Sequence, residues 1–144
     1  MKALTLLMLL VGFGNYCYSQ TEITWEDLKF DTVVETWSED FQSYYQVPHF
    51  TANTNKLDGK EISIKGYFHP IDLLDGYYEL CKSEIITSYC YFPPRLETIE
   101  VQMNIESPPE LNEQITISDI LKLNTDDILL NNFILENAKI ITDK

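Results

Sequence analysis

The chain has one arginine, two histidines and, after its first twenty residues, no long apolar run. A membrane-spanning helix needs about 20 apolar residues, so the later sequence predicts none. Basic residues are scarce: 10 Lys and Arg stand against 23 Asp and Glu, for a formal net charge of −13. Such a charge repels the phosphates of nucleic acid. Nucleic acid is therefore excluded as an expected partner.

The first apolar segment has the order of a secretory signal peptide. Lys2 supplies the positive charge, residues 4–13 are apolar, and Cys17 and Ser19 are small residues at positions −3 and −1 of a cleavage site. We expect residues 1–19 to be removed and the protein to be exported, either to the periplasm or out of the cell. The alternatives are a buried N-terminal helix and a lipoprotein acylated at Cys17, which the preceding tyrosine disfavours.

Cysteine is equally scarce, with three copies in the chain. Removal of residues 1–19 leaves 9 basic and 23 acidic residues, a formal charge of −14, and the two cysteines Cys81 and Cys90. An even pair in an oxidising compartment suits a disulfide. Closing this short loop would stabilise the fold by about 2.5–3 kcal/mol. Two buried free thiols are the alternative.

Residues 20–56 predict an N-terminal extension that is partly helical. Thr24 and Asp27 fit the capping box of a short helix. Residues 38–41 favour a second helical turn, and Pro48 would end it. The aromatic residues of this second segment are expected to face inward: Phe41, Tyr44 and Tyr45.

Beyond residue 56 the apolar period becomes two, which is typical of strands with one buried face. Turn residues separate five such segments: 61–68, 77–81, 97–105, 114–123 and 133–141. Short strands without a long amphipathic helix favour a closed or nearly closed barrel. We therefore predict one mainly β domain over residues 57–144, a small five-stranded Greek-key barrel.

One residue breaks this alternation. Asp119 falls on the apolar face of the fourth segment, between Ile117 and Leu121. A bulge or bend at this position would turn its carboxylate out of the core. We expect such a bulge or bend.

The segment 57–70 reads L-D-G-K-x-I-x-I-K-G-Y-x-x-P, and Pro93-Pro94 later precede a β-run. Together these segments resemble a family of exported bacterial proteins of unknown function. The resemblance covers residues 57–141 and implies an oligonucleotide/oligosaccharide-binding (OB) type barrel. Two departures are Asp119, where the family usually has glycine, and Arg95-Leu96, where an asparagine usually follows the prolines. The resemblance implies fold and compartment and no activity.

Catalytic motifs are missing from the sequence. It contains neither a Gly-x-Ser-x-Gly elbow nor a His-Glu-x-x-His pair. His69 lies near Cys81 and Cys90 in the expected fold, but the wide cysteine spacing does not match the close pairs of a structural zinc site. We predict no catalytic residue, no metal site and no cofactor.

The remaining prediction is a non-catalytic binding module. Its partner is an unknown protein or a small neutral or cationic ligand, because the surface is acidic. Candidate ligand-binding residues are the tyrosines expected around one barrel face: Tyr67, Tyr77, Tyr78, Tyr89 and Tyr91. The competing predictions are a metal-dependent or carboxylate-based hydrolase and a structural envelope protein.

Overall fold

The computed structural model describes residues 20–85 and 97–141. The predicted signal peptide and Cys17 lie outside these residues, as do Tyr89, Cys90 and Tyr91. Within the described residues, no helix is both long and apolar enough to cross a membrane.

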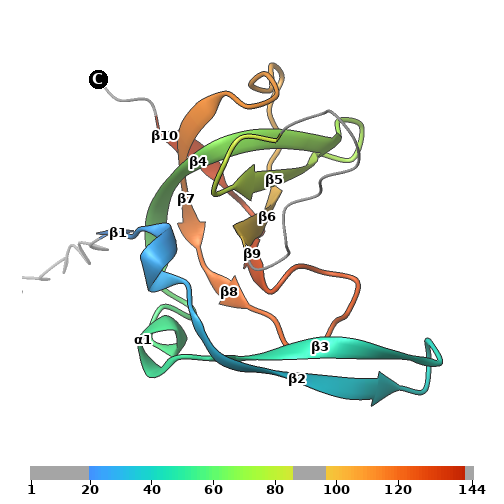
Figure 1. Cartoon of the computed structure of the whole chain (residues 1–144). Helices are drawn as coiled ribbons and strands as arrows, with labels where there is room; N and C mark the ends of the chain where they lie inside the picture. The colour runs from blue at the N-terminus through green and yellow to red at the C-terminus, as the bar shows by residue number, and fades with distance from the viewer. Residues whose placement is uncertain (1–19, 86–96, 142–144) are drawn as a thin grey trace, which may run out of the picture.

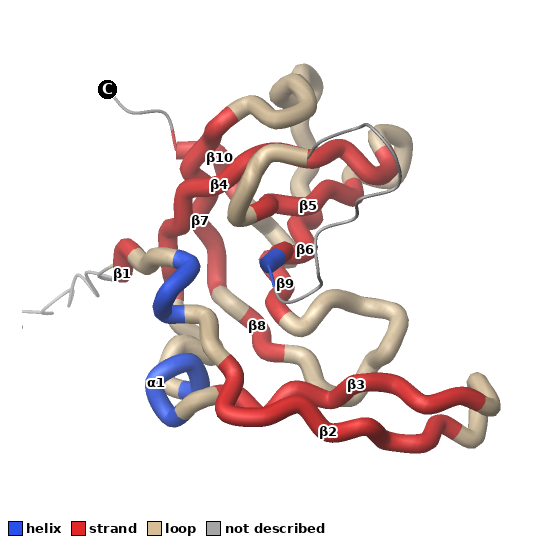
Figure 2. The backbone as a smooth tube through the Cα atoms, in the orientation of Figure 1, coloured by secondary structure: helices blue, strands red, loops and turns tan. Residues whose placement is uncertain are grey.

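Strands make up most of the described fold (Figure 1). In chain order the elements are β1 (Thr21–Glu22), a 3-10 helix (Trp25–Asp27), β2 (Phe30–Ser38), β3 (Ser43–Phe50), α1 (Ala52–Asn55), β4 (Glu61–Asp72), β5 (Tyr77–Cys81), β6 (Thr98–Gln102), β7 (Gln114–Ile120), β8 (Lys122–Leu123), β9 (Phe133–Leu135) and β10 (Lys139–Ile141). One sheet has the order β10-β7-β4-β5-β6-β9-β8, with β1 added to β4. It curls into a half-barrel (Figure 2). The mainly β class is confirmed.

The strand count differs from the prediction. The segment 77–81 is β5 as expected, whereas 61–68 extends through Pro70 to Asp72. The fourth and fifth expected strands each divide in two, so that β7 pairs with β4 while β8 pairs with β9. In terms of the five expected segments, the sheet order is fifth, fourth, first, second, third, fifth and fourth. The five-stranded Greek-key barrel stays a prediction.

Asp119 does not form the predicted bulge. The β4–β7 pairing runs from Glu61 to Tyr67 without a register shift, and Ile62 lies opposite Asp119. The Asp119 carboxylate stays on the strand and accepts the backbone N–H of Asn137 at 2.6 Å. That N–H belongs to the turn between β9 and β10. The carboxylate therefore has a hydrogen-bond donor without any bulge in β7.

The core fills the concave side of the sheet. Alternate residues of β4 point into it as predicted, as do those of β5 and β6. Its most deeply buried apolar side chains are Ile62, Ile64, Phe68, Leu80, Ile99, Val101, Ile117, Leu121, Phe133 and Leu135. Gly66 allows β5 to cross β4 closely: a Cβ there would lie 2.7 Å from Leu80 Cγ and 2.8 Å from the Cys81 carbonyl oxygen.

The prediction of a partly helical N-terminal extension is wrong for residues 30–50. Residues 30–50 form a long antiparallel hairpin of β2 and β3, and the segment expected as a second helical turn is the hairpin turn. The first helical turn is confirmed: the Asp27 carboxylate accepts the Thr24 backbone N–H at 2.8 Å and the Thr24 hydroxyl at 2.9 Å.

Candidate functional site

The β2–β3 hairpin projects from the half-barrel (Figure 1). Its two strands pair with each other and, in the part of the chain that the structure describes, with no third strand. Three aromatic rings anchor its base: Phe30 lies 5.3 Å from Phe50, and Phe133 of the core lies 5.5 Å from both. The far part of the hairpin has no such support.

Large apolar side chains are exposed along this far part. Trp37 and Tyr44 face each other across the two strands, with ring centroids 5.1 Å apart in an edge-on arrangement. Their exposed fractions are 42% and 69%. Val33, Val34 and Phe41 are exposed as well. Phe41 and Tyr44 therefore do not face inward as predicted.

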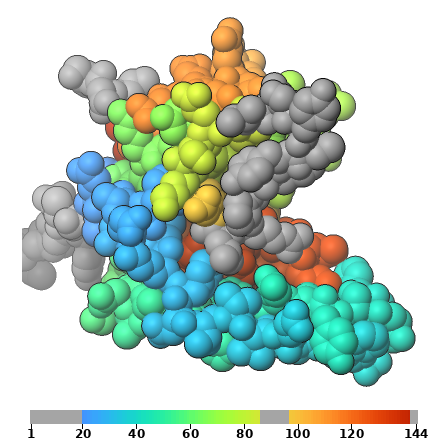
Figure 3. Space-filling view, in the orientation of Figure 1, coloured from blue at the N-terminus to red at the C-terminus, as the bar shows by residue number. Residues whose placement is uncertain are grey.

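A cleft of about 540 Å³ lies between the hairpin and the loop of residues 124–132, which we call the 124–132 loop. In Figure 3 the hairpin forms a ridge along the lower edge, with this red loop above it. Val33, Tyr44 and Pro48 of the hairpin contribute one wall, and Ile128 and Leu130 of the loop contribute the other. We call this space the hairpin cleft.

The hairpin cleft is acidic. Residues 30–50 contain four acids, namely Asp31, Glu35, Glu39 and Asp40, and no Lys or Arg. Glu35 lines the cleft from the hairpin and Asp127 lines it from the loop. Aromatic surface and negative charge thus occur together.

Asn124 shapes the 124–132 loop. Its side-chain nitrogen donates to the backbone oxygens of Asp127 at 2.7 Å and Asn131 at 3.1 Å. Its side-chain oxygen accepts the backbone N–H of Asp127 at 3.0 Å. Because buried polar groups that are fully bonded hold one conformation, Asn124 fixes the loop that forms the second wall of the cleft.

The other end of this loop covers a polar row on the convex face of the sheet. His69, Glu79 and Glu100 lie side by side on β4, β5 and β6. Asn131 of the loop donates its backbone N–H to Glu100 at 3.0 Å and its side-chain N–H to Glu79 at 3.0 Å. Glu100 is completely buried, and Thr98 nearly so. The alternation of residues 97–105 puts both side chains on the face opposite the core, where Asn131 of the 124–132 loop donates a hydrogen bond to each of them.

Cys81 lies at the edge of this polar row. A nitrogen of His69, a carboxylate oxygen of Glu79 and the Cys81 sulfur lie within 4.8 Å of one another. Burial first, and then the Glu79 carboxylate, raise the pKa of the Cys81 thiol to about 12. Cys81 is a free thiol in the structure. Because Cys90 lies outside the described residues, the Cys81–Cys90 disulfide stays a prediction.

The tyrosines chosen from the sequence do not all share one surface. Tyr67 and Tyr77 are half-buried on β4 and β5. Tyr78 points to the opposite face, where it is 2% exposed and packs 5.0 Å from the ring of Phe68. Tyr78 therefore belongs to the core and not to an exposed aromatic patch.

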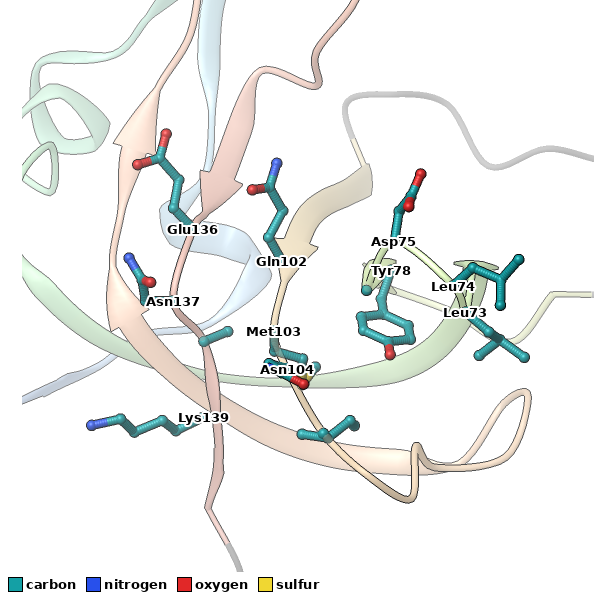
Figure 4. Close-up of a pocket in the computed structure, with 13 residues that line it drawn as sticks. Leu73, Leu74, Asp75, Tyr78, Gln102, Met103, Asn104, Glu136, Asn137 and Lys139 are labelled. Atoms are coloured by element: carbon teal, nitrogen blue, oxygen red, sulfur yellow. The ribbon is translucent and has the colours of Figure 1, made fainter.

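The edge of Tyr78 reaches a second cleft, of about 570 Å³, at the end of the half-barrel (Figure 4). Leu73 and Leu74 stand on one side of it, with Glu136 and Asn137 on the other. Glu136 is engaged by Lys122 at 2.8 Å. This second cleft brings together no cluster of potential metal ligands among the described residues.

No family model matches the sequence, and no curated protein matches it. The fold is similar to that in the crystal structure of a DUF3299 family protein from Pseudomonas aeruginosa PAO1, with a TM-score of 0.55. The two chains are 15% identical over 88% of this chain and 99% of that chain. At this identity the likeness shows the fold alone. The neighbour belongs to a family of unknown function, in agreement with the kind of family that the sequence resembles.

Proposed function

We propose that the protein is an exported, non-catalytic interaction module. In this proposal an OB-like half-barrel is the scaffold, and the hairpin cleft holds an extended, positively charged segment of a partner protein. The observation that carries the proposal is the projecting hairpin, whose Tyr44 and Tyr45 line one wall of an acidic cleft, with the exposed Trp37 packed against Tyr44.

The hairpin supports this proposal through its own stability. A two-stranded ribbon is marginally stable in water unless another surface packs on it. Here Val33, Trp37 and Tyr44 are exposed. Exposed apolar surface of this kind usually marks an interaction site. A bound segment would bury these side chains and stabilise the hairpin.

The charge of the cleft indicates which kind of segment fits. Glu35 and Asp127 face the same space, and no Lys or Arg is among the described residues that line it. Opposite charges across an interface raise the association rate and exclude acidic competitors. A segment with Lys or Arg beside apolar side chains complements both properties.

Site-specific photo-crosslinking in the native envelope fraction tests the proposal. A photoreactive phenylalanine analogue replaces Tyr44 in one protein and Leu111 in a matched protein. Leu111 is also exposed, at 41%, but it lies in the loop before β7. We expect a discrete crosslinked partner from position 44 and none from position 111.

A second test reverses the charge of the acidic residues that line the hairpin cleft. Glu35→Lys combined with Asp127→Lys should abolish the crosslink from position 44, and added salt should weaken it. A short peptide of alternating Lys and Leu should bind the purified protein, and a Glu–Leu peptide should not. Equal crosslinking from both positions, or equal binding of the two peptides, would refute the proposal. The competing functions, a hydrolase and a structural envelope protein, predict no such selectivity.

A further inference from the structure

We propose that His69, Glu79 and Cys81 form a binding site for a divalent transition-metal cation of the Zn²⁺ class. This site lies on the convex face of the sheet, and the proposal goes beyond the partner-binding function. The pairing of β4 with β5 places His69 directly opposite Glu79. Cys81 follows two residues later on β5, so its side chain points to the same face.

The spacing of the three donor atoms fits a tetrahedral cation. All three lie within 4.8 Å of one another. His69 Nδ1 and Glu79 Oε2 are 3.4 Å apart, which is long for a hydrogen bond. Metal–ligand bonds of about 2.0–2.1 Å at the tetrahedral angle separate two ligand atoms by about 3.4 Å. The observed separation of the nitrogen and the oxygen therefore suits two ligands of one ion, with the Cys81 sulfur within 4.8 Å of both.

The donor set selects the class of metal. Imidazole nitrogen and thiolate sulfur suit Zn²⁺ and related transition metals, whereas Ca²⁺ and Mg²⁺ require oxygen ligands. One sulfur, one nitrogen and one oxygen make three protein ligands. A fourth tetrahedral position remains for water or for a donor atom of a bound molecule.

The surroundings hold the Glu79 carboxylate in place. Asn131 donates to Glu79 Oε1 at 3.0 Å, which leaves Oε2 directed at His69. Asn131 is itself fixed by its backbone N–H, which Glu100 accepts at 3.0 Å. Carboxylate ligands in metal sites are commonly oriented by such a hydrogen bond on their second oxygen.

Each side chain is also accessible to the degree that a metal site needs. The side chains of His69 and Glu79 are 16% and 18% exposed, and Cys81 is fully buried behind them. Two of the three ligands are therefore in contact with solvent, from which a cation can reach them.

Titration of the reduced, metal-free protein with Zn²⁺ and Co²⁺ tests the site. We expect one ion per chain and, for Co²⁺, the thiolate-to-cobalt charge-transfer absorption that only a cysteine ligand produces. Binding should weaken as the pH falls, because the ligands must lose their protons. Zn²⁺ should raise the melting temperature, and EDTA should reverse the rise.

Variants identify the ligands. Asn131→Ala should weaken Zn²⁺ binding by about 10–100-fold, as expected for the loss of an orienting hydrogen bond. His69→Gln, Glu79→Gln and Cys81→Ser should each weaken it further. His49→Gln is the matched control, since His49 lies on the hairpin and outside the cluster. Circular dichroism establishes that each variant is folded.

Three outcomes would overturn the site. The first is the absence of stoichiometric Zn²⁺ binding, and the second is an equal loss in His49→Gln and His69→Gln. The third is a complete Cys81–Cys90 disulfide in the exported protein, detected by mass spectrometry without reductant, because an oxidised sulfur is no longer a thiolate ligand. None of these measurements involves a partner, so failure here is distinct from failure of the proposed interaction.

Discussion

The indole N–H of Trp25 donates a hydrogen bond to the backbone carbonyl of Lys65 at 2.8 Å. Lys65 lies in a gap along β4, between the part that pairs with β1, at Ile62 and Ser63, and the part that begins to pair with β5 at Tyr67. The Trp25 side chain thus supplies the hydrogen-bond donor that a neighbouring strand would otherwise provide to Lys65.

Trp25→Phe should therefore lower the free energy of unfolding by about 1–2 kcal/mol, because it keeps most of the ring and removes the only donor of that bond. Urea denaturation followed by circular dichroism measures the change. Trp37→Phe is the matched control: Trp37 is exposed on the hairpin, so its replacement should change stability by about 0.5 kcal/mol or less. Equal effects of the two substitutions would contradict this role of Trp25.

Gly66→Ala should destabilise the protein by about 3 kcal/mol, because the new Cβ would overlap the Leu80 side chain and the Cys81 carbonyl. Gly59→Ala provides the comparison. Gly59 has a φ of +71° and open space around its Cα, so alanine should cost only about 1 kcal/mol there. Thermal melting of both variants shows which substitution lowers the melting temperature more. A Gly66→Ala protein with the melting temperature of the wild type would refute the prediction.

Glu100→Ala should cost about 2–3 kcal/mol, because the backbone N–H of Asn131 would lose its acceptor in a buried place. Glu100→Gln retains a side-chain oxygen at that position and should lose less. Chemical denaturation compares the two variants. If glutamine proved as damaging as alanine, the hydrogen bond to Asn131 would not be the source of the effect.

The stability of the reduced, metal-free protein should depend on Cys81 at high pH. Burial raises the pKa of this thiol from 9.0 to about 12 in the folded protein. Below pH 9 both states hold the proton, and between pH 9 and about 12 only the folded state does, so stability falls as the pH rises. Denaturation at several pH values should show a shallower decline for Cys81→Ser, with Lys and Tyr titrating alike in both proteins. Parallel declines would contradict the raised pKa.

The half-barrel strands were predictable because apolar residues alternate with polar ones along the longest of them. Ile62, Ile64 and Phe68 alternate with polar residues in β4, and this period of two identified the strand and its inward side. The split at Leu121 was not visible in the pattern, because residues on both sides of it continue the same alternation.

The hairpin was missed for the opposite reason. Both of its faces are largely exposed, so β2 shows no alternation between apolar and polar residues. Its remaining signal was the β-branched and aromatic content of residues 32–37. That signal would have found the strands, although not the cleft, which depends on how the 124–132 loop packs.

The polar row illustrates what alternation leaves undetermined. The pattern in β6 correctly placed Glu100 on the face opposite the core, but it contains no information about what covers that face. Asn131, which lies 31 residues later in the chain, packs over Glu100 and donates a hydrogen bond to it. The sequence placed His69 near Cys81, but it did not bring Glu79 to them, because the position of Glu79 opposite His69 follows only from the register of β4 and β5.

The parallel pairing of β1 with β4 covers part of an edge of the sheet. Thr21 and Glu22 occupy the edge of β4 at Ile62 and Ser63, and the Ile23 N–H continues the pairing to the Ser63 carbonyl at 2.9 Å. An uncovered strand edge is a template for pairing with another chain. We therefore expect a protein shortened past Ile23 to expose that edge of β4 to pairing with its own copies.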